Sequence, residues 1–205
     1  MPTITKLVQT SGLYPCMRVD LDGRYAFSLE PEVAMHLKEG QCLSEDELET
    51  LLRANERERA QAAALRALGH RPYSRQEMAQ KLARKHFDED TTAQVLANLT
   101  ARGLLDDAEF ARFWRDNRDA FRPRSRALVG LELRRKGVAV DAVNSATADM
   151  DDEASALQAG EKKAKTLKGA DYDTFYRRLG DYLKRRGYNY EVIKVTINKL
   201  WQAQM

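Results

Sequence analysis

Arginine side chains are the groups in this sequence whose type and spacing could do chemistry. The segment from Phe110 to Gly137 carries nine Arg or Lys residues against three acids, a net charge of +6. A guanidinium presents paired donors in a fixed plane, which suits phosphate and carboxylate oxygens. The pattern therefore predicts a surface that binds a polyanion or an acidic protein face. Its nine basic residues are Arg112, Arg115, Arg118, Arg122, Arg124, Arg126, Arg134, Arg135 and Lys136.

The best binding candidates in this segment are the arginines around Pro123. Arg112 can pair with Asp116 four residues further on, in the weaker orientation with the basic residue first. Arg115 can pair with Asp119 in the same way. Another set has no such local partner, and we expect it to be exposed at a corner between two helices: Arg118, Arg122, Arg124 and Arg126. A solvated basic face that binds nothing is the alternative interpretation.

Two further basic clusters follow along the chain. A lysine-rich cluster is typical of a solvated helix surface, and consists of Lys162, Lys163, Lys165 and Lys168. An arginine-rich cluster is better suited to binding phosphates or carboxylates, and consists of Arg177, Arg178, Lys184, Arg185 and Arg186. Basic residues in the last turn of a helix also suit the negative end of its dipole, so part of this charge has a structural explanation.

Catalytic and cofactor chemistry have no comparable pattern. The sequence contains neither GxxxxGK[ST] nor a GxGxxG loop after a strand, so no nucleotide site is predicted. Its three histidines are scattered, and its two cysteines lie in no ligand spacing, so we expect reduced thiols. The acid pairs Asp106-Asp107 and Asp151-Asp152 are expected to cap helices. We therefore expect no enzyme, cofactor or metal; a magnesium-dependent nuclease using the first pair is the alternative.

Four aromatic residues lie on one side of the helix that opens the basic segment: Phe110, Phe113, Trp114 and Phe121. Such a stripe is more often core than a platform for stacking nucleic-acid bases. We therefore expect all four to pack in the interior.

The charge of the chain is unevenly distributed. Its 205 residues have a formal net charge of +3, but residues 1–59 carry −4 and the remainder +7. The sequence shows no secretory signal and no apolar run of roughly 20 residues, so a cytoplasmic protein is expected.

The N-terminal region predicts strands. Apolar segments at ITKLV, MRVDL and RYAFSL come first, and Asp22-Gly23 between the last two favours a tight hairpin turn. A short helix is expected over residues 32–38, ended by Gly40. Ser44 and Glu47 form a capping box that opens a charged helix.

A phrase of six residues occurs three times in the helical remainder. LARKHF begins at Leu82, LRRKGV at Leu133 and LKRRGY at Leu183, which gives offsets of 51 and 50 residues. The leucine lies on a helical face with an apolar residue four positions before it, and the glycine of the last two copies suits a left-handed C-cap. The phrase therefore predicts the end of a helix in each of three repeats.

The resulting fold is mainly α: three tandem three-helix repeats in an elongated, curved body, with a small N-terminal β-hairpin extension. The expected divisions are residues 1–43 for the hairpin arm and short helix, 44–59 for the charged connecting helix, and 60–104, 105–150 and 151–205 for the repeats, of which the second is the most basic.

The helical part resembles the RecX family, bacterial modulators of the RecA recombinase. The resemblance rests on RPYSRQEMAQKLARKHF from Arg71, LTARGLLDDAEFARFWRDNR from Leu99, ELRRKGV from Glu132 and YLKRRGYNYEVI from Tyr182. It covers about residues 60–200, and the arm resembles the extension of longer members. His86 replaces the glycine of the family pattern.

The resemblance implies a regulator that binds in the groove of a RecA filament on single-stranded DNA. It also implies suppression of ATP hydrolysis, strand exchange and coprotease activity, and thereby a role in DNA repair and the SOS response. We expect a monomer that binds RecA and the single-stranded DNA of the filament, with weak binding to duplex DNA. A free-standing DNA-binding protein that acts without a recombinase is the alternative.

Overall fold

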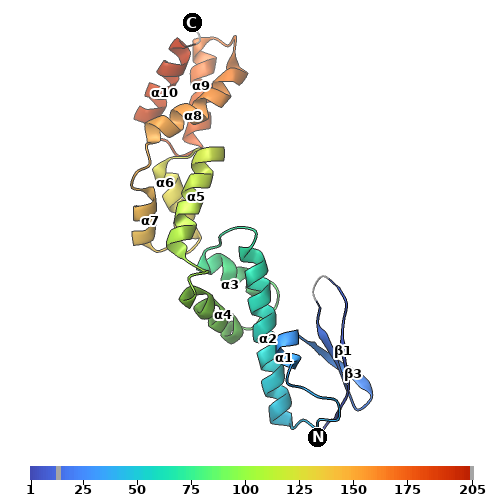
Figure 1. The fold of residues 1–205 in the computed structure, drawn as a ribbon. Helices are drawn as coiled ribbons and strands as arrows, with labels where there is room; N and C mark the ends of the chain where they lie inside the picture. The colour runs from blue at the N-terminus through green and yellow to red at the C-terminus, as the bar shows by residue number, and fades with distance from the viewer. Residues whose placement is uncertain (13–14, 204–205) are drawn as a thin grey trace. The chain divides into compact units, whose positions relative to one another are not determined.

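A computed structural model describes residues 1–12 and 15–203 as helices and a small sheet (Figure 1). The chain divides into two compact units. Unit 1 contains residues 1–71 and 78–104, and unit 2 contains residues 72–77 together with the chain from residue 105 onward. The predicted mainly helical class with an N-terminal β extension is confirmed.

The N-terminal strands form one antiparallel sheet in the order β1-β2-β3, with bounds Ile4–Gln9, Met17–Leu21 and Arg24–Leu29. Asp22 and Gly23 have φ angles of 48° and 77°, as the predicted hairpin turn between β2 and β3 requires. The sheet buries Ile4, Val19 and Leu29 with helix residues of unit 1. The hairpin is therefore confirmed, and β1 extends it to three strands.

Helix α1 covers Pro31–Ala34, which is shorter than the predicted helix over residues 32–38. Helix α2, Glu45–Leu68, begins at Ser44 with both hydrogen bonds of the predicted capping box to Glu47. It continues without a break past residue 60, so the connecting helix and the first helix of the first repeat are one helix. Helices α3 and α4 cover Arg75–Ala83 and Glu89–Ala101.

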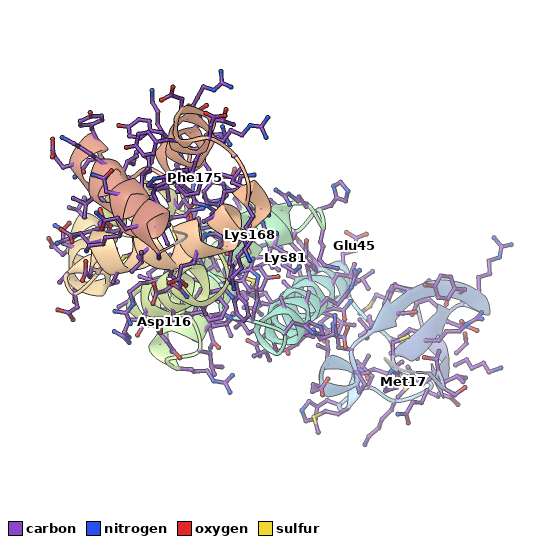
Figure 2. The ribbon with its side chains drawn as sticks, turned by 90° about the horizontal axis from the view of Figure 1, so that it is seen from above. Met17, Glu45, Lys81, Asp116, Lys168 and Phe175 are labelled. Carbon is purple, nitrogen blue, oxygen red and sulfur yellow. The ribbon has the colours of Figure 1, made fainter. Side chains whose placement is uncertain are left out.

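Unit 2 contains the second and third repeats. Helices α5, α6 and α7 cover Asp107–Phe121, Arg126–Arg135 and Val140–Thr147. Helices α8, α9 and α10 cover Asp152–Ala164, Tyr172–Lys184 and Tyr190–Gln202, with a 3-10 turn at Lys165–Leu167. Phe175 lies at the centre of the last three helices, fully buried (Figure 2).

The repeated phrase ends a helix in all three repeats, as predicted. Leu82, Leu133 and Leu183 are fully buried, and each accepts a hydrogen bond from the N–H five residues further on. The residue before that donor has positive φ in each case: His86, Gly137 and Gly187, at 64°, 80° and 87°. His86 therefore adopts the left-handed cap conformation that glycine adopts at the equivalent positions of the other two repeats.

The start of α6, the second helix of the second repeat, is closed by residues of the third repeat. Ser125 caps α6 through its Oγ, which accepts the N–H of Leu128 at 3.2 Å, while its own N–H donates to the carbonyl of Arg186 at 3.0 Å. The N–H of Arg126 donates to Asp152 Oδ1 at 2.7 Å. The acceptors for the N–H groups of Ser125 and Arg126 thus both come from the third repeat.

The start of α3, which belongs to the first repeat, is likewise closed by residues of the second repeat. Residues 72–77 at this start are part of unit 2. Ser74 Oγ donates to the carbonyl of Lys136 at 2.7 Å, and the N–H of Arg75 donates to Asp107 Oδ1 at 2.7 Å. The first acid of each pair, Asp106 or Asp151, caps its own helix, as predicted. The second acid caps the helix of the preceding repeat, a role that no local pattern indicates.

Candidate functional site

The corner between α5 and α6 gathers charged side chains around Glu132. Arg118 Nε and Trp114 Nε1 each lie 2.8 Å from Glu132 Oε2. The Arg118 guanidinium also lies 4.3 Å from the centroid of the Trp114 ring, a favourable cation–π contact. Glu132 therefore holds Arg118 and Trp114 together across two helices.

Arg124 makes an ion pair with the other oxygen of Glu132. Arg186 of the third repeat reaches the same corner, where a terminal nitrogen lies 3.3 Å from the carbonyl of Pro123 and the guanidinium stacks 4.4 Å from the Tyr182 ring centroid. Among the residues that the structure describes, its Nε atom is buried without a hydrogen-bond partner.

Positive charge exceeds negative charge at this corner, which we call the arginine corner and define as Arg118, Arg122, Arg124 and Arg186 with Glu132. Burial lowers the pKa of Arg124, and the positive charges of the other three arginines lower it further. Burial also lowers the pKa of Arg118. Repulsion among like charges is relieved by an anion, so the arrangement is suited to a phosphate or carboxylate.

Two arginines of this set are less exposed than the sequence predicts. The side chains of Arg118 and Arg124 are 18% and 29% exposed, because each pairs with Glu132, which lies too far along the chain for the i,i+4 rule. The expectation of exposure is confirmed for Arg122 and Arg126. Arg115 pairs with its neighbour Asp116 at 2.7 Å, rather than showing the predicted bond to Asp119.

One aromatic prediction is wrong. Phe110 is fully buried and Phe113 and Trp114 are half-buried, but Phe121 is 72% exposed. It is the last residue of α5, where the chain turns toward Pro123 and the helix no longer faces the core. The exposed ring therefore lies beside Arg122 on the chain instead of in the interior.

The remaining predicted binding residues divide by exposure. Lys136 is half-buried, because its ammonium pairs with Glu77 and lies 4.1 Å from the Trp114 ring centroid. Arg115, at the α5–α7 contact, donates to the carbonyl of Ala146 at 3.0 Å. The others are exposed on α5, α6 and α9 or at the end of α9: Arg112, Arg134, Arg135, Arg177, Arg178, Lys184 and Arg185.

Replacing Glu132 by Gln should lower the free energy of unfolding by about 2 kcal/mol, because hydrogen bonds to a charged group are lost while two half-buried guanidiniums keep their charge. Thermal unfolding followed by circular dichroism measures the change. Glu191→Gln on the exposed surface of α10 is the matched control. Equal melting temperatures for the two variants would mean that Glu132 does not hold the corner together.

Neither a metal centre nor a membrane span is found in residues 1–12 and 15–203. No group of three or more His, Cys, Asp or Glu side chains there could hold a metal ion. In the same part of the chain, none of the helices combines the length and apolar character that crossing a membrane requires.

Known proteins share these tandem three-helix repeats. A family model for the first three-helix domain of RecX matches residues 60–99, and a model for the third matches residues 151–197. The regulatory protein RecX of Chlorobium limicola is 33% identical over 70% of this chain and 91% of its own length. That of Mycobacterium ulcerans is 39% identical over 66% of this chain and 80% of its own.

This chain belongs to the RecX family. Solved structures agree at the level of the fold. A crystal structure of a regulatory protein RecX covers 97% of this chain and all of the other, with a TM-score of 0.67 and 20% identity. RecX from Lactobacillus salivarius covers 72% of this chain with a TM-score of 0.60 and 21% identity.

Proposed function

We propose that this protein is an inhibitor of RecA that binds in the groove of the RecA filament on single-stranded DNA. It contacts neighbouring RecA protomers as a monomer and suppresses ATP hydrolysis, strand exchange and coprotease activity. Membership of a family of regulatory proteins supports this assignment. Its setting is the cytoplasm, where RecA meets DNA.

The arginine corner is the observation that carries the proposal. Four guanidinium groups lie close enough to repel one another, and Glu132 pairs with two of them, Arg118 and Arg124. DNA phosphates and the acidic side chains of a protein both supply the negative charge that would offset this excess of positive charge. A ligand with negative charge therefore completes the corner.

Phe121 gives the same surface an aromatic component. Its ring is 72% exposed beside Arg122 in the chain. An exposed ring can stack on an unpaired base, which duplex DNA does not offer. Arginines with an adjacent exposed ring therefore favour single-stranded over duplex DNA as the nucleic acid in contact.

The decisive experiment measures RecA ATP hydrolysis on single-stranded DNA, with RecA from the same organism, while this protein is titrated in at fixed salt. We expect a fall at substoichiometric amounts that excess DNA does not relieve. A fall that extra DNA abolishes would instead indicate a free-standing DNA-binding protein. Steep loss of naked-DNA affinity with salt, unaffected by RecA, would support that second outcome.

A further inference from the structure

Unit 1 contains a groove whose chemistry is opposite to that of the arginine corner. It is lined by residues of α1, α2 and α4 and has a volume of about 800 Å³. Its lining includes four carboxylates, from Glu32, Asp46, Glu47 and Glu58, against one arginine and one histidine. The groove lies in a region of net negative charge, because residues 1–59 carry −4. Phosphate ligands are therefore disfavoured here.

The floor of the groove is apolar. It is lined by Val33 of α1, Leu37 shortly after α1 and Leu51 of α2. Each of the three is half-buried and packs against the core beneath the sheet. Val95 of α4 also lines the groove and is 3% exposed. An apolar floor between carboxylates is typical of a binding site for an amphipathic segment.

The groove follows one face of α2. Asp46, Thr50, Ala54, Arg57 and Gln61 line it at spacings of three or four residues, the repeat of a single helical face. Fifteen residue steps from Asp46 to Gln61 correspond to about 22 Å at roughly 1.5 Å per residue. A helix of about 15 residues has the matching length.

We propose that this groove binds an amphipathic helix of a partner protein, with an apolar stripe for the floor and Lys or Arg residues for the acidic rim. The helix-in-groove mode uses anchors at i, i+3 or i+4 and i+7, and the α2 residues of the lining recur at the same spacing of three or four residues. Most of the lining precedes residue 60, where the match to the RecX domain models begins. The proposal is independent of inhibition through the arginine corner.

A fluorescein-labelled designed helix of about 15 residues, with a leucine stripe flanked by lysines, serves as the probe. Two comparison peptides are used. One has the same residues in scrambled order, and the other has the same leucine stripe flanked by glutamates. Fluorescence anisotropy with the full chain at fixed ionic strength measures the affinities. We expect the basic amphipathic peptide to bind at least about tenfold more tightly than either comparison, a difference of about 1.4 kcal/mol.

Two variants locate the binding in the groove. Thr50→Trp fills it from an exposed position of α2, and Glu58→Lys reverses one rim charge. We expect each to weaken the probe about tenfold or more. Glu49→Lys makes the same charge change on the same helix outside the lining and should bind as the parent does. If Thr50→Trp lowers the melting temperature, the test of the proposal is the difference in peptide affinity between Glu58→Lys and Glu49→Lys.

Several outcomes would overturn the proposal. Equal affinity for the scrambled peptide would show that the groove does not select an amphipathic helix. Unchanged binding by Glu58→Lys would place the peptide elsewhere. Self-association of the parent chain in sedimentation experiments, abolished by Thr50→Trp, would assign the groove to a second copy of this chain instead. RecA ATPase inhibition is expected to be the same for all four proteins.

Discussion

Reversing the charge of Arg122 and Arg126 together should weaken binding to RecA–DNA filaments by at least about tenfold, or about 1.4 kcal/mol, while the melting temperature stays within error of the parent. Both side chains are exposed around Pro123, so their loss removes attraction to anions without opening the interior. Arg118 and Arg124 are left intact because reversing them would break the ion pairs with Glu132. Filament binding is measured by fluorescence anisotropy at several salt concentrations.

The salt dependence provides an internal check. If both arginines bind phosphates, the slope of log affinity against log salt should fall by about one for each phosphate that is no longer neutralised. Lys162→Glu with Lys165→Glu is the matched control, because it makes the same charge change on α8 and the adjoining turn, where the sequence indicates a solvated surface. An equal weakening by the two double variants would mean that net charge, not the arginine corner, determines binding.

Gly187→Ala should lower the free energy of unfolding by about 3 kcal/mol, because overpacking adds to the cost of a left-handed backbone. Gly187 has φ of +87°, and a Cβ there would meet Ser125 Oγ at 2.5 Å and Leu128 Cβ at 2.8 Å. Both neighbours belong to the second repeat, at the start of α6. Chemical denaturation measures the change.

Gly169→Ala is the control for this substitution. Its φ of +80° is nearly the same, but nothing lies within 4 Å of the position that a Cβ would take. We expect it to show the backbone cost alone, about 1 kcal/mol. If the two variants are destabilised equally, the close approach of the second and third repeats adds nothing to the cost.

Elements with local signals were predictable from the sequence. Asp22-Gly23 set the β2–β3 turn, and Ser44 with Glu47 set the start of α2, because each depends on residues within four positions. The ends of the repeat helices were also predictable, since a buried leucine and a left-handed cap lie five residues apart or less. Short-range geometry determines these features.

Features that depend on distant residues were not predictable. Glu132 reaches Arg118 from 14 residues further along the chain, so the i,i+4 rule could not indicate the pair. Phe121 fits the aromatic stripe by spacing, but it ends its helix and faces outward. The groove of unit 1 needs α1, α2 and α4 in place before its acids and its apolar floor come together.

The caps that one repeat receives from the next impose an order on folding during synthesis. Arg126 obtains its acceptor from Asp152, 26 residues later, and Arg75 obtains its own from Asp107, 32 residues later. During synthesis on the ribosome, the second helix of a repeat therefore emerges before the carboxylate that completes its first turn. Removal of the third repeat would leave the Arg126 N–H at the start of α6 without its acceptor, Asp152. The helices α9 and α10 of the third repeat need no such contribution, because Asp171 and Asn189 cap them locally.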